Sequence, residues 1–208
     1  MNLAEFRRLP LIGIVRGAKP QDIPPLINAV VKAGLKTLEI TMNTLGAAGL
    51  IKEAVKLSAG KLTIGAGTVL SEKDLNIALD NGATFIVSPV LVKKVVKKCN
   101  QKKVPVFPGA FTPQEIFNAW ECGAAMVKVF PAQFFGPAYF KEIKGPFKNI
   151  KLLACGGIRP QNVGEFFKQG AGAVAFGGSV FSEERLINKQ FSAIEDDVRA
   201  LVAAVKLT

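Results

Sequence analysis

Apolar runs of strand length alternate with amphipathic helical patterns along nearly the whole chain. Each run ends in a polar or glycine-containing turn, and a stretch with apolar residues at helical spacing follows it. The alternation predicts eight strands, which are Leu11–Arg16, Thr37–Met42, Leu62–Val69, Phe85–Pro89, Val104–Gly109, Met126–Pro131, Lys151–Gly157 and Ala173–Gly178. It also predicts eight helices, over residues 22–33, 46–58, 72–81, 92–102, 113–122, 137–144, 160–169 and 183–206.

Local signals support these boundaries. Ser71 and Thr112 are residue types that cap helix N-termini, and each precedes a predicted helix. Four glycines stand where helices should end, shortly before the next strand: Gly34, Gly82, Gly123 and Gly170. The sequence therefore reads as a regular series of βα units.

Eight βα units with continuously apolar strands indicate a closed parallel barrel, because strands covered on both faces lose the polar alternation of an exposed sheet. We predict one (β/α)8 TIM barrel domain spanning residues 1–208. A doubly wound open sheet is the alternative, but it usually contains fewer units.

Composition narrows the class of protein. Of the 208 residues 49% are apolar and 21% charged, as in a globular protein. No apolar run approaches the roughly 18 residues that a membrane helix needs, so we expect no membrane association. The three cysteines have no metal-ligand spacing, which suggests free thiols in a reducing cytoplasm. The chain contains no histidine, which removes the usual general base and most zinc or iron sites.

The net charge of +11 raises the question of nucleic-acid binding. The densest basic cluster lies on one predicted helix, without interleaved aromatic residues, and comprises Lys93, Lys94, Lys97, Lys98, Lys102 and Lys103. A solvated helix face explains this cluster better than a nucleic-acid partner. The positive field can instead attract small anionic substrates.

One lysine occupies an unusual position. In the predicted strand around Lys128, alternation places Met126, Lys128 and Phe130 on one face and Val127 and Val129 on the other. An ammonium group among apolar residues is costly unless it is paired or loses its proton. The neutral amine is a nucleophile toward a ketone. A structural ion pair is the alternative explanation for such a lysine.

Other polar residues lie near the C-terminal ends of predicted strands, where TIM barrels carry their active sites. They are Arg16, Glu39, Thr41, Asn43 and Thr68. By alternation Glu39 shares its face with Thr41 and Asn43, and Thr68 shares its face with Ile64 and Ala66. If both faces point into the barrel, a carboxylate, an arginine, a hydroxyl and Lys128 meet in one pocket. The alternatives for single residues are that Glu39 is a salt-bridge partner of Lys128 and that Arg16 caps a loop.

Two glycine clusters end the last two strands: Gly156-Gly157, and Gly177-Gly178 followed by Ser179. Loops at these two places in a TIM barrel frequently bind phosphate through backbone N–H groups. Glycines that only permit tight turns are the alternative. The position of both clusters favours a phosphate site.

These residues belong to a set of short motifs that resembles a known family. The motifs occur in order along the chain: Leu38-Glu39-Ile40-Thr41, Gly65-Ala66-Gly67-Thr68-Val69, Ile86-Val87-Ser88-Pro89, Pro108-Gly109, Lys128-Val129-Phe130-Pro131, Gly145-Pro146-Phe147, Gly156-Gly157-Ile158 and Gly177-Gly178-Ser179. Together they resemble the class I 2-keto-3-deoxy-6-phosphogluconate aldolases and their 6-phosphogalactonate and 4-hydroxy-2-oxoglutarate relatives.

The resemblance implies a homotrimer of TIM barrels that needs no metal or organic cofactor. It implies that Lys128 forms a Schiff base, that Glu39 is the general acid and base, and that Thr68 helps to hold the pyruvate carboxylate. Phe130 and Pro89 would line the pocket. The expected partners are pyruvate and a 2-keto-3-deoxy sugar acid phosphate.

Four positions bear on the branch of the family. Asn43 stands where many gluconate-type members carry a carboxylate-binding arginine, whereas the segment ending in Arg16 resembles the galactonate-type branch. We therefore expect Arg16, with its bidentate fork, to bind the substrate carboxylate. Ser179 agrees with the gluconate type, and Cys155 matches neither branch. The sequence leaves the branch open.

Two other functions are compatible with such a barrel. One is a sugar-phosphate isomerase or epimerase that uses Glu39 as a base and forms no imine. The other is a phosphate-binding barrel without catalytic activity.

Overall fold

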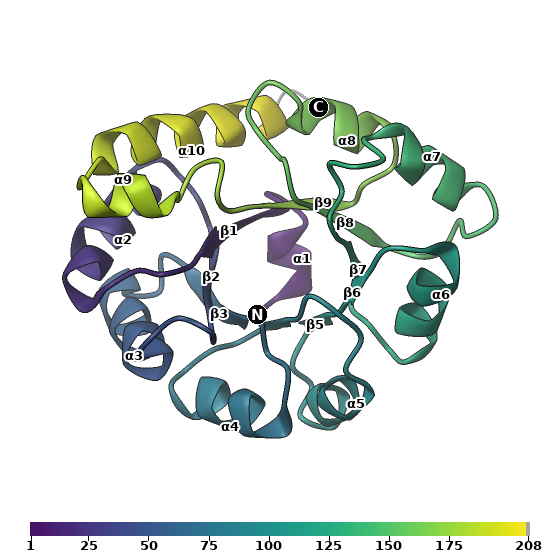
Figure 1. Cartoon of the computed structure of the whole chain (residues 1–208), viewed down its shortest axis with the longest axis horizontal. Helices are drawn as coiled ribbons and strands as arrows, with labels where there is room; N and C mark the ends of the chain where they lie inside the picture. The colour runs from purple at the N-terminus through teal and green to yellow at the C-terminus, as the bar shows by residue number, and fades with distance from the viewer. Residues whose placement is uncertain (207–208) are drawn as a thin grey trace.

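The computed structural model describes residues 1–206 as a parallel barrel surrounded by helices, which confirms the predicted fold class (Figure 1). Within these residues nine strands form one sheet in the order β5-β4-β3-β2-β1-β9-β8-β7-β6. Their bounds are β1 Leu11–Val15, β2 Thr37–Thr41, β3 Thr63–Gly67, β4 Ile86–Val87, β5 Val106–Phe107, β6 Gly109–Ala110, β7 Val127–Val129, β8 Leu152–Cys155 and β9 Ala173–Phe176.

The predicted fifth strand is divided in the structure. Only Pro108 separates β5 from β6, and a proline cannot donate a ladder hydrogen bond. The first half pairs with β4 and the second half with β7. The two halves thus join the ends of the sheet and close an eight-stranded ring.

Helices follow the strands and cover the outside of this ring (Figure 1). Their bounds are η1 Pro20–Asp22, α2 Ile23–Lys32, α3 Ala47–Ser58, α4 Glu72–Asp80, α5 Lys93–Gln101, α6 Pro113–Glu121, α7 Ala138–Lys144, α8 Val163–Lys168, α9 Glu183–Ile187 and α10 Phe191–Lys206. The predicted last helix is therefore two helices, α9 and α10. Lys189, between them, has a φ of 53°, which is incompatible with a continuous helix.

One helix was not predicted from the pattern. Helix α1, Leu3–Phe6, lies across the ring of strands rather than outside it (Figure 1). Phe6 is buried, and its ring centroid lies 6.0 Å from that of Phe107 on β5. Asn2 caps this short helix by accepting a hydrogen bond from the Ala4 amide at 2.9 Å. The helix therefore fills one end of the barrel interior.

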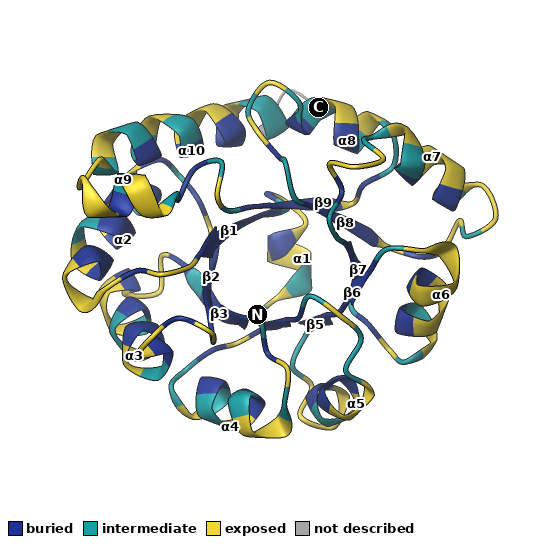
Figure 2. Ribbon diagram, viewed as in Figure 1, coloured by how far each residue is buried: buried dark blue, intermediate teal, exposed yellow. Residues whose placement is uncertain are grey.

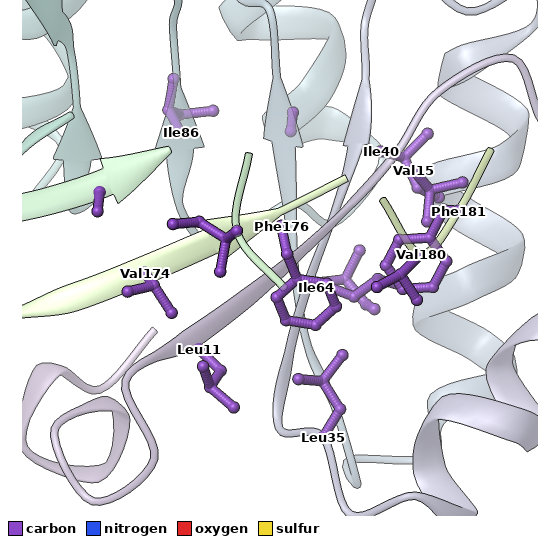
Figure 3. Packing of buried hydrophobic residues seen from close by; sticks show 14 of the residues in the cluster. Leu11, Val15, Leu35, Ile40, Ile64, Ile86, Val174, Phe176, Val180 and Phe181 are labelled. Carbon is purple, nitrogen blue, oxygen red and sulfur yellow. The ribbon is translucent and has the colours of Figure 1, made fainter. Parts of the chain in front are cut away.

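The apolar core has two layers because alternate strand residues point to opposite faces. The outer layer lies between strands and helices and includes Leu11, Ile40, Ile64 and Val174 (Figure 3). The inner layer fills the barrel and comprises Phe6, Ile12, Ile14, Phe85, Val87, Phe107, Met126, Leu153, Cys155, Ala173 and Ala175. Burial is accordingly concentrated on the strands and on the inward sides of the helices (Figure 2).

No helix within residues 1–206 is long and apolar enough to span a membrane.

Candidate active site

A cavity of about 430 Å³ opens at the C-terminal ends of the strands. Twelve of the thirteen residues predicted for the site line it: Arg16, Glu39, Thr68, Pro89, Lys128, Phe130, Cys155, Gly156, Gly157, Gly177, Gly178 and Ser179. The cavity thus brings together residues that lie on or just after strands β1, β2, β3, β4, β7, β8 and β9.

Strand β7 directs Lys128 into this cavity. Val127 and Val129 belong to the outer core layer, whereas Met126 and Phe130 pack with the inner layer, as alternation predicted. Lys128 is 6% exposed, and its Nζ lies 5.0 Å from the centroid of the Phe130 ring. An ammonium group above a ring face is stabilised by the negative potential of the ring, which offsets part of the cost of its burial.

Strand β2 places Glu39 in the same cavity, and Gly67 makes room for it. Glu39 pairs in register with Gly65 on β3 and is 1% exposed. A Cβ atom at Gly67 would lie 2.2 Å from Oε1 of Glu39, so any side chain there would displace the carboxylate. Oε2 of Glu39 is buried without a hydrogen-bond partner among the described residues.

Burial raises the pKa of Glu39 from its usual value of 4.5 to about 7, although the positive charges of Lys128 and Arg16 act in the opposite direction. A carboxyl group with a pKa near 7 exists in both protonation states at neutral pH. It can therefore give and accept a proton within one reaction cycle.

Arg16 follows β1, and a hydrogen bond fixes the backbone next to it. The amide of Gly17 donates a hydrogen bond to Oγ1 of Thr44 at 3.1 Å, and that oxygen lies 3.0 Å from Oγ1 of Thr41 at the end of β2. The Arg16 side chain is exposed within the cavity lining. Its guanidinium group is thus available to an anionic ligand.

Thr68 reaches the cavity in a way that alternation did not predict. Ile64 and Ala66 point to the outer core, so the expectation that their face points inward was wrong. Thr68 nevertheless lines the cavity, and its φ of 54° marks a break in the extended conformation after β3. The left-handed region is strained for a β-branched residue, and such strain often occurs at functional sites.

The two glycine clusters form the wall beside β8 and β9. Gly156 and Gly157 have φ values of 103° and 74°, which a residue with a side chain would adopt only under strain. Oγ of Ser179 donates a hydrogen bond to the carbonyl of Ile158 at 2.6 Å, which ties the second cluster to the first.

Cys155 ends β8 on the inner face of the barrel and is buried. Burial raises the pKa of the Cys155 thiol above its usual value of 9.0, while the charge of Lys128 opposes this shift. The thiol is therefore neutral near pH 7 and is a weak donor and acceptor rather than a nucleophile.

Asn43 is the exception among the predicted residues. It is exposed and is not part of the cavity lining, although alternation places it on the face of Glu39. Strand β2 ends at Thr41, and the amide of Thr44 donates a hydrogen bond to the Thr41 carbonyl at 3.0 Å. The chain therefore turns before Asn43, and the structure does not bring this residue into the cavity lining.

A family model described as KDPG and KHG aldolase matches residues 3–196. The chain belongs to this aldolase family. The 2-dehydro-3-deoxy-6-phosphogalactonate aldolase of Escherichia coli is 30% identical over 96% of this chain and 98% of its own length. The 2-dehydro-3-deoxy-phosphogluconate aldolase of Haemophilus influenzae is 32% identical over 98% of this chain and 96% of its own.

A solved structure also resembles this aldolase. The KDPG aldolase from Legionella pneumophila, with pyruvate captured as a covalent carbinolamine intermediate, superposes with a TM-score of 0.87. It is 26% identical, and the match covers 95% of this chain and 96% of that chain.

Sequence reasoning missed several residues that line the aldolase cavity: Ile14, Gly17, Phe176, Phe181, Ser182 and Glu183. Glu183 was assigned only to a helix. Its position one residue after a serine, at the start of a helix that follows a barrel strand, was a usable signal.

Within residues 1–206 no group of three His, Cys, Asp or Glu side chains is arranged to hold a metal ion.

Proposed function

We propose that this aldolase cleaves 2-keto-3-deoxy-6-phospho sugar acids, of the gluconate or galactonate form, to pyruvate and glyceraldehyde 3-phosphate through an imine on Lys128. The observation that carries the proposal is one cavity that contains a buried lysine and a buried carboxyl group with a pKa near 7.

The amine of Lys128 attacks the C2 ketone and forms a carbinolamine. Loss of water gives the protonated imine, which draws electrons from the C3–C4 bond. When that bond breaks, the electron pair enters the imine to form an enamine, and the aldehyde leaves. Protonation of the enamine at C3 and hydrolysis of the imine then release pyruvate and regenerate the amine.

Glu39 transfers the protons that these steps require. As a carboxylic acid it protonates the carbinolamine hydroxyl, which leaves as water. As a carboxylate it takes the proton of the C4 hydroxyl during cleavage. The unpartnered Oε2 of Glu39 supports this role, because a buried oxygen without a protein partner is free to bind a substrate hydroxyl or water.

The remaining groups fit the two ends of the substrate. Arg16 binds the carboxylate, and the Thr68 hydroxyl assists it. Backbone N–H groups of the glycine clusters and of Ser179 bind the phosphate. Pro89, Phe130 and the uncharged Cys155 line the middle of the pocket.

The same steps cleave 4-hydroxy-2-oxoglutarate to pyruvate and glyoxylate, and we propose this keto acid as a second substrate. Its C4 carbon carries a hydroxyl group that Glu39 can deprotonate in the same way.

Trapping the imine tests the proposal. Pyruvate with borohydride should add one reduced adduct per chain at Lys128, which mass spectrometry of the intact chain and its peptides detects. An adduct at the exposed Lys97 instead would contradict the mechanism. An unmodified chain would favour an isomerase, in which Lys128 only stabilises charge, or a barrel that binds phosphate without catalysis.

We further propose that the aldolase is a cytoplasmic homotrimer. Large apolar side chains are exposed near the active-site end, among them Val90 at 52%, Phe134 at 72% and Phe135 at 55%. Phe135 also stacks on Phe111 at a centroid distance of 4.8 Å, which makes a continuous aromatic surface suited to a second copy of the chain. The molar mass in solution, measured by light scattering, tests this assembly.

The three free cysteines support a reducing compartment.

A further inference from the structure

Four charged side chains line the active-site cavity: Arg16, Glu39, Lys128 and Glu183. The proposed function uses the first three at the end of the cavity where the keto acid reacts. Glu183 has no part in it, although it adds a negative charge to a cavity that should bind an anionic substrate.

Glu183 lies beside the proposed phosphate loop. It is the first residue of α9, and Ser179 precedes it by only four positions in the connection from β9. Ser182 caps the helix by accepting a hydrogen bond from the Arg185 amide at 3.2 Å. Glu183 therefore lines the same cavity as Gly178 and Ser179, from the first residue of a capped helix.

No described side chain neutralises this carboxylate. Glu183 makes no ion pair within residues 1–206, and the nearby Arg185 is bound to Asp197 at 2.6 Å. Glu183 also lines a smaller cavity of about 140 Å³, in which Lys19, Asp22 and Lys189 are the other charged residues. Neither lysine lies within ion-pair distance of it.

We propose that Glu183 sets the specificity of this aldolase for the distal end of its substrate, by disfavouring a 6-phosphate relative to a 6-hydroxyl group. The inference rests on the proposed function, because it places the phosphate at the glycine clusters. Arg16 and Lys128 are the basic side chains of the cavity lining, and both serve the keto acid end. The phosphate would then meet neutral N–H groups and one carboxylate.

A further activity follows from this arrangement. A dianionic phosphate is repelled by a nearby carboxylate, whereas a hydroxyl group can donate a hydrogen bond to it. The unphosphorylated 2-keto-3-deoxy sugar acids are therefore substrates of the same site, cleaved by the same steps on Lys128 to pyruvate and an uncharged aldehyde.

The expected effect is modest because Glu183 is exposed and solvent screens its charge. Removing the charge in Glu183→Gln should raise the ratio of kcat/KM for the phosphorylated substrate to that for the unphosphorylated one by about 3- to 10-fold. Reversing the charge in Glu183→Lys should raise this ratio further, to about 10- to 100-fold above wild type.

Glu184 provides a matched control. It is exposed, lies next in the chain and does not line the cavity, so Glu184→Gln and Glu184→Lys change the net charge equally. We expect both control variants to keep the wild-type ratio within about twofold. In 0.5 M salt the effect of the Glu183 variants should shrink, since the Debye length falls to about 4–5 Å. Thermal unfolding of each variant identifies any loss of folding.

The outcomes are distinguishable from failure of the proposed function. Pyruvate has no distal end, so borohydride trapping at Lys128 tests the imine independently of Glu183. If trapping succeeds but the Glu183 variants leave the ratio within twofold, or the Glu184 variants raise it equally, Glu183 does not set specificity. The same conclusion follows if wild type does not cleave the unphosphorylated substrate.

Discussion

Replacing Glu39 by glutamine should remove activity and, above neutral pH, stabilise the folded chain. The carboxyl group is buried, Oε2 has no partner, and its pKa is raised to about 7 by burial. Glutamine has nearly the same shape but carries no charge at any pH. The substitution therefore separates the cost of burying the charge from the cost of occupying the space.

Proton linkage determines how the free energy of unfolding changes with pH. The pKa of Glu39 is higher in the folded chain than in the unfolded chain, so the folded state binds this proton more tightly. The stabilisation from this proton is fully present below pH 4.5 and is lost as the pH rises through about 7. The difference between these two pKa values corresponds to about 3 kcal/mol of unfolding free energy.

Urea unfolding followed by circular dichroism, at one protein concentration and at several pH values between about 4 and 8, measures this quantity. The free energy of unfolding of Glu39→Gln minus that of wild type should increase by about 3 kcal/mol across the range. An exposed control, Glu184→Gln, should show no comparable trend.

A difference that stays constant within about 1 kcal/mol would refute the reasoning. It would mean that Lys128 and Arg16 offset burial completely and keep the Glu39 carboxylate charged in the folded state. An active Glu39→Gln enzyme would separately contradict the proton-transfer role.

Two further predictions concern the substrate. Arg16→Ala should weaken pyruvate capture by about 10- to 150-fold, the contribution of a charged hydrogen bond, and a loss below about threefold in a pyruvate trapping titration would show that another group binds the carboxylate. Because the Cys155 thiol is neutral and a weak partner, wild type should cleave the gluconate and galactonate epimers at C4 with similar kcat/KM. Cys155→Thr should raise the ratio of kcat/KM for the gluconate epimer to that for the galactonate epimer by about 2- to 13-fold, and Cys155→Val should lower it. If neither variant changes this ratio, Cys155 contributes only to packing.

The pattern of the sequence was sufficient to predict the barrel and the inward position of Lys128. Alternation along β7 is undisturbed, so Val127 and Val129 mark the outer face and Lys128 must point inward. The same rule failed at Thr68 and Asn43, because both residues lie beyond the end of their strands. Alternation describes strands only, and active-site residues often stand one or two positions past a strand end.

Long-range packing explains the other misses. Helix α1 is only four residues long, and its place across the barrel depends on the contact between Phe6 and Phe107, about a hundred positions apart in the chain. Glu183 lines one cavity with Arg16, Glu39 and Lys128, which are far from it in the chain. No local pattern encodes the contact between Phe6 and Phe107.

The surroundings of Glu39 show what it costs the fold to bury a carboxyl group without a hydrogen-bond partner. A packed barrel would fill the space over Gly67 with a side chain, yet a Cβ there would lie 2.2 Å from Oε1 of Glu39. Gly67 therefore leaves this space to the Glu39 carboxylate, whose Oε2 has no partner, which is costly for a buried polar atom. Within residues 1–206, Oε2 of Glu39 is the one buried side-chain nitrogen or oxygen without a hydrogen-bond partner. The two-layer apolar core compensates for that local cost, so the unpaired oxygen can persist until a substrate binds it.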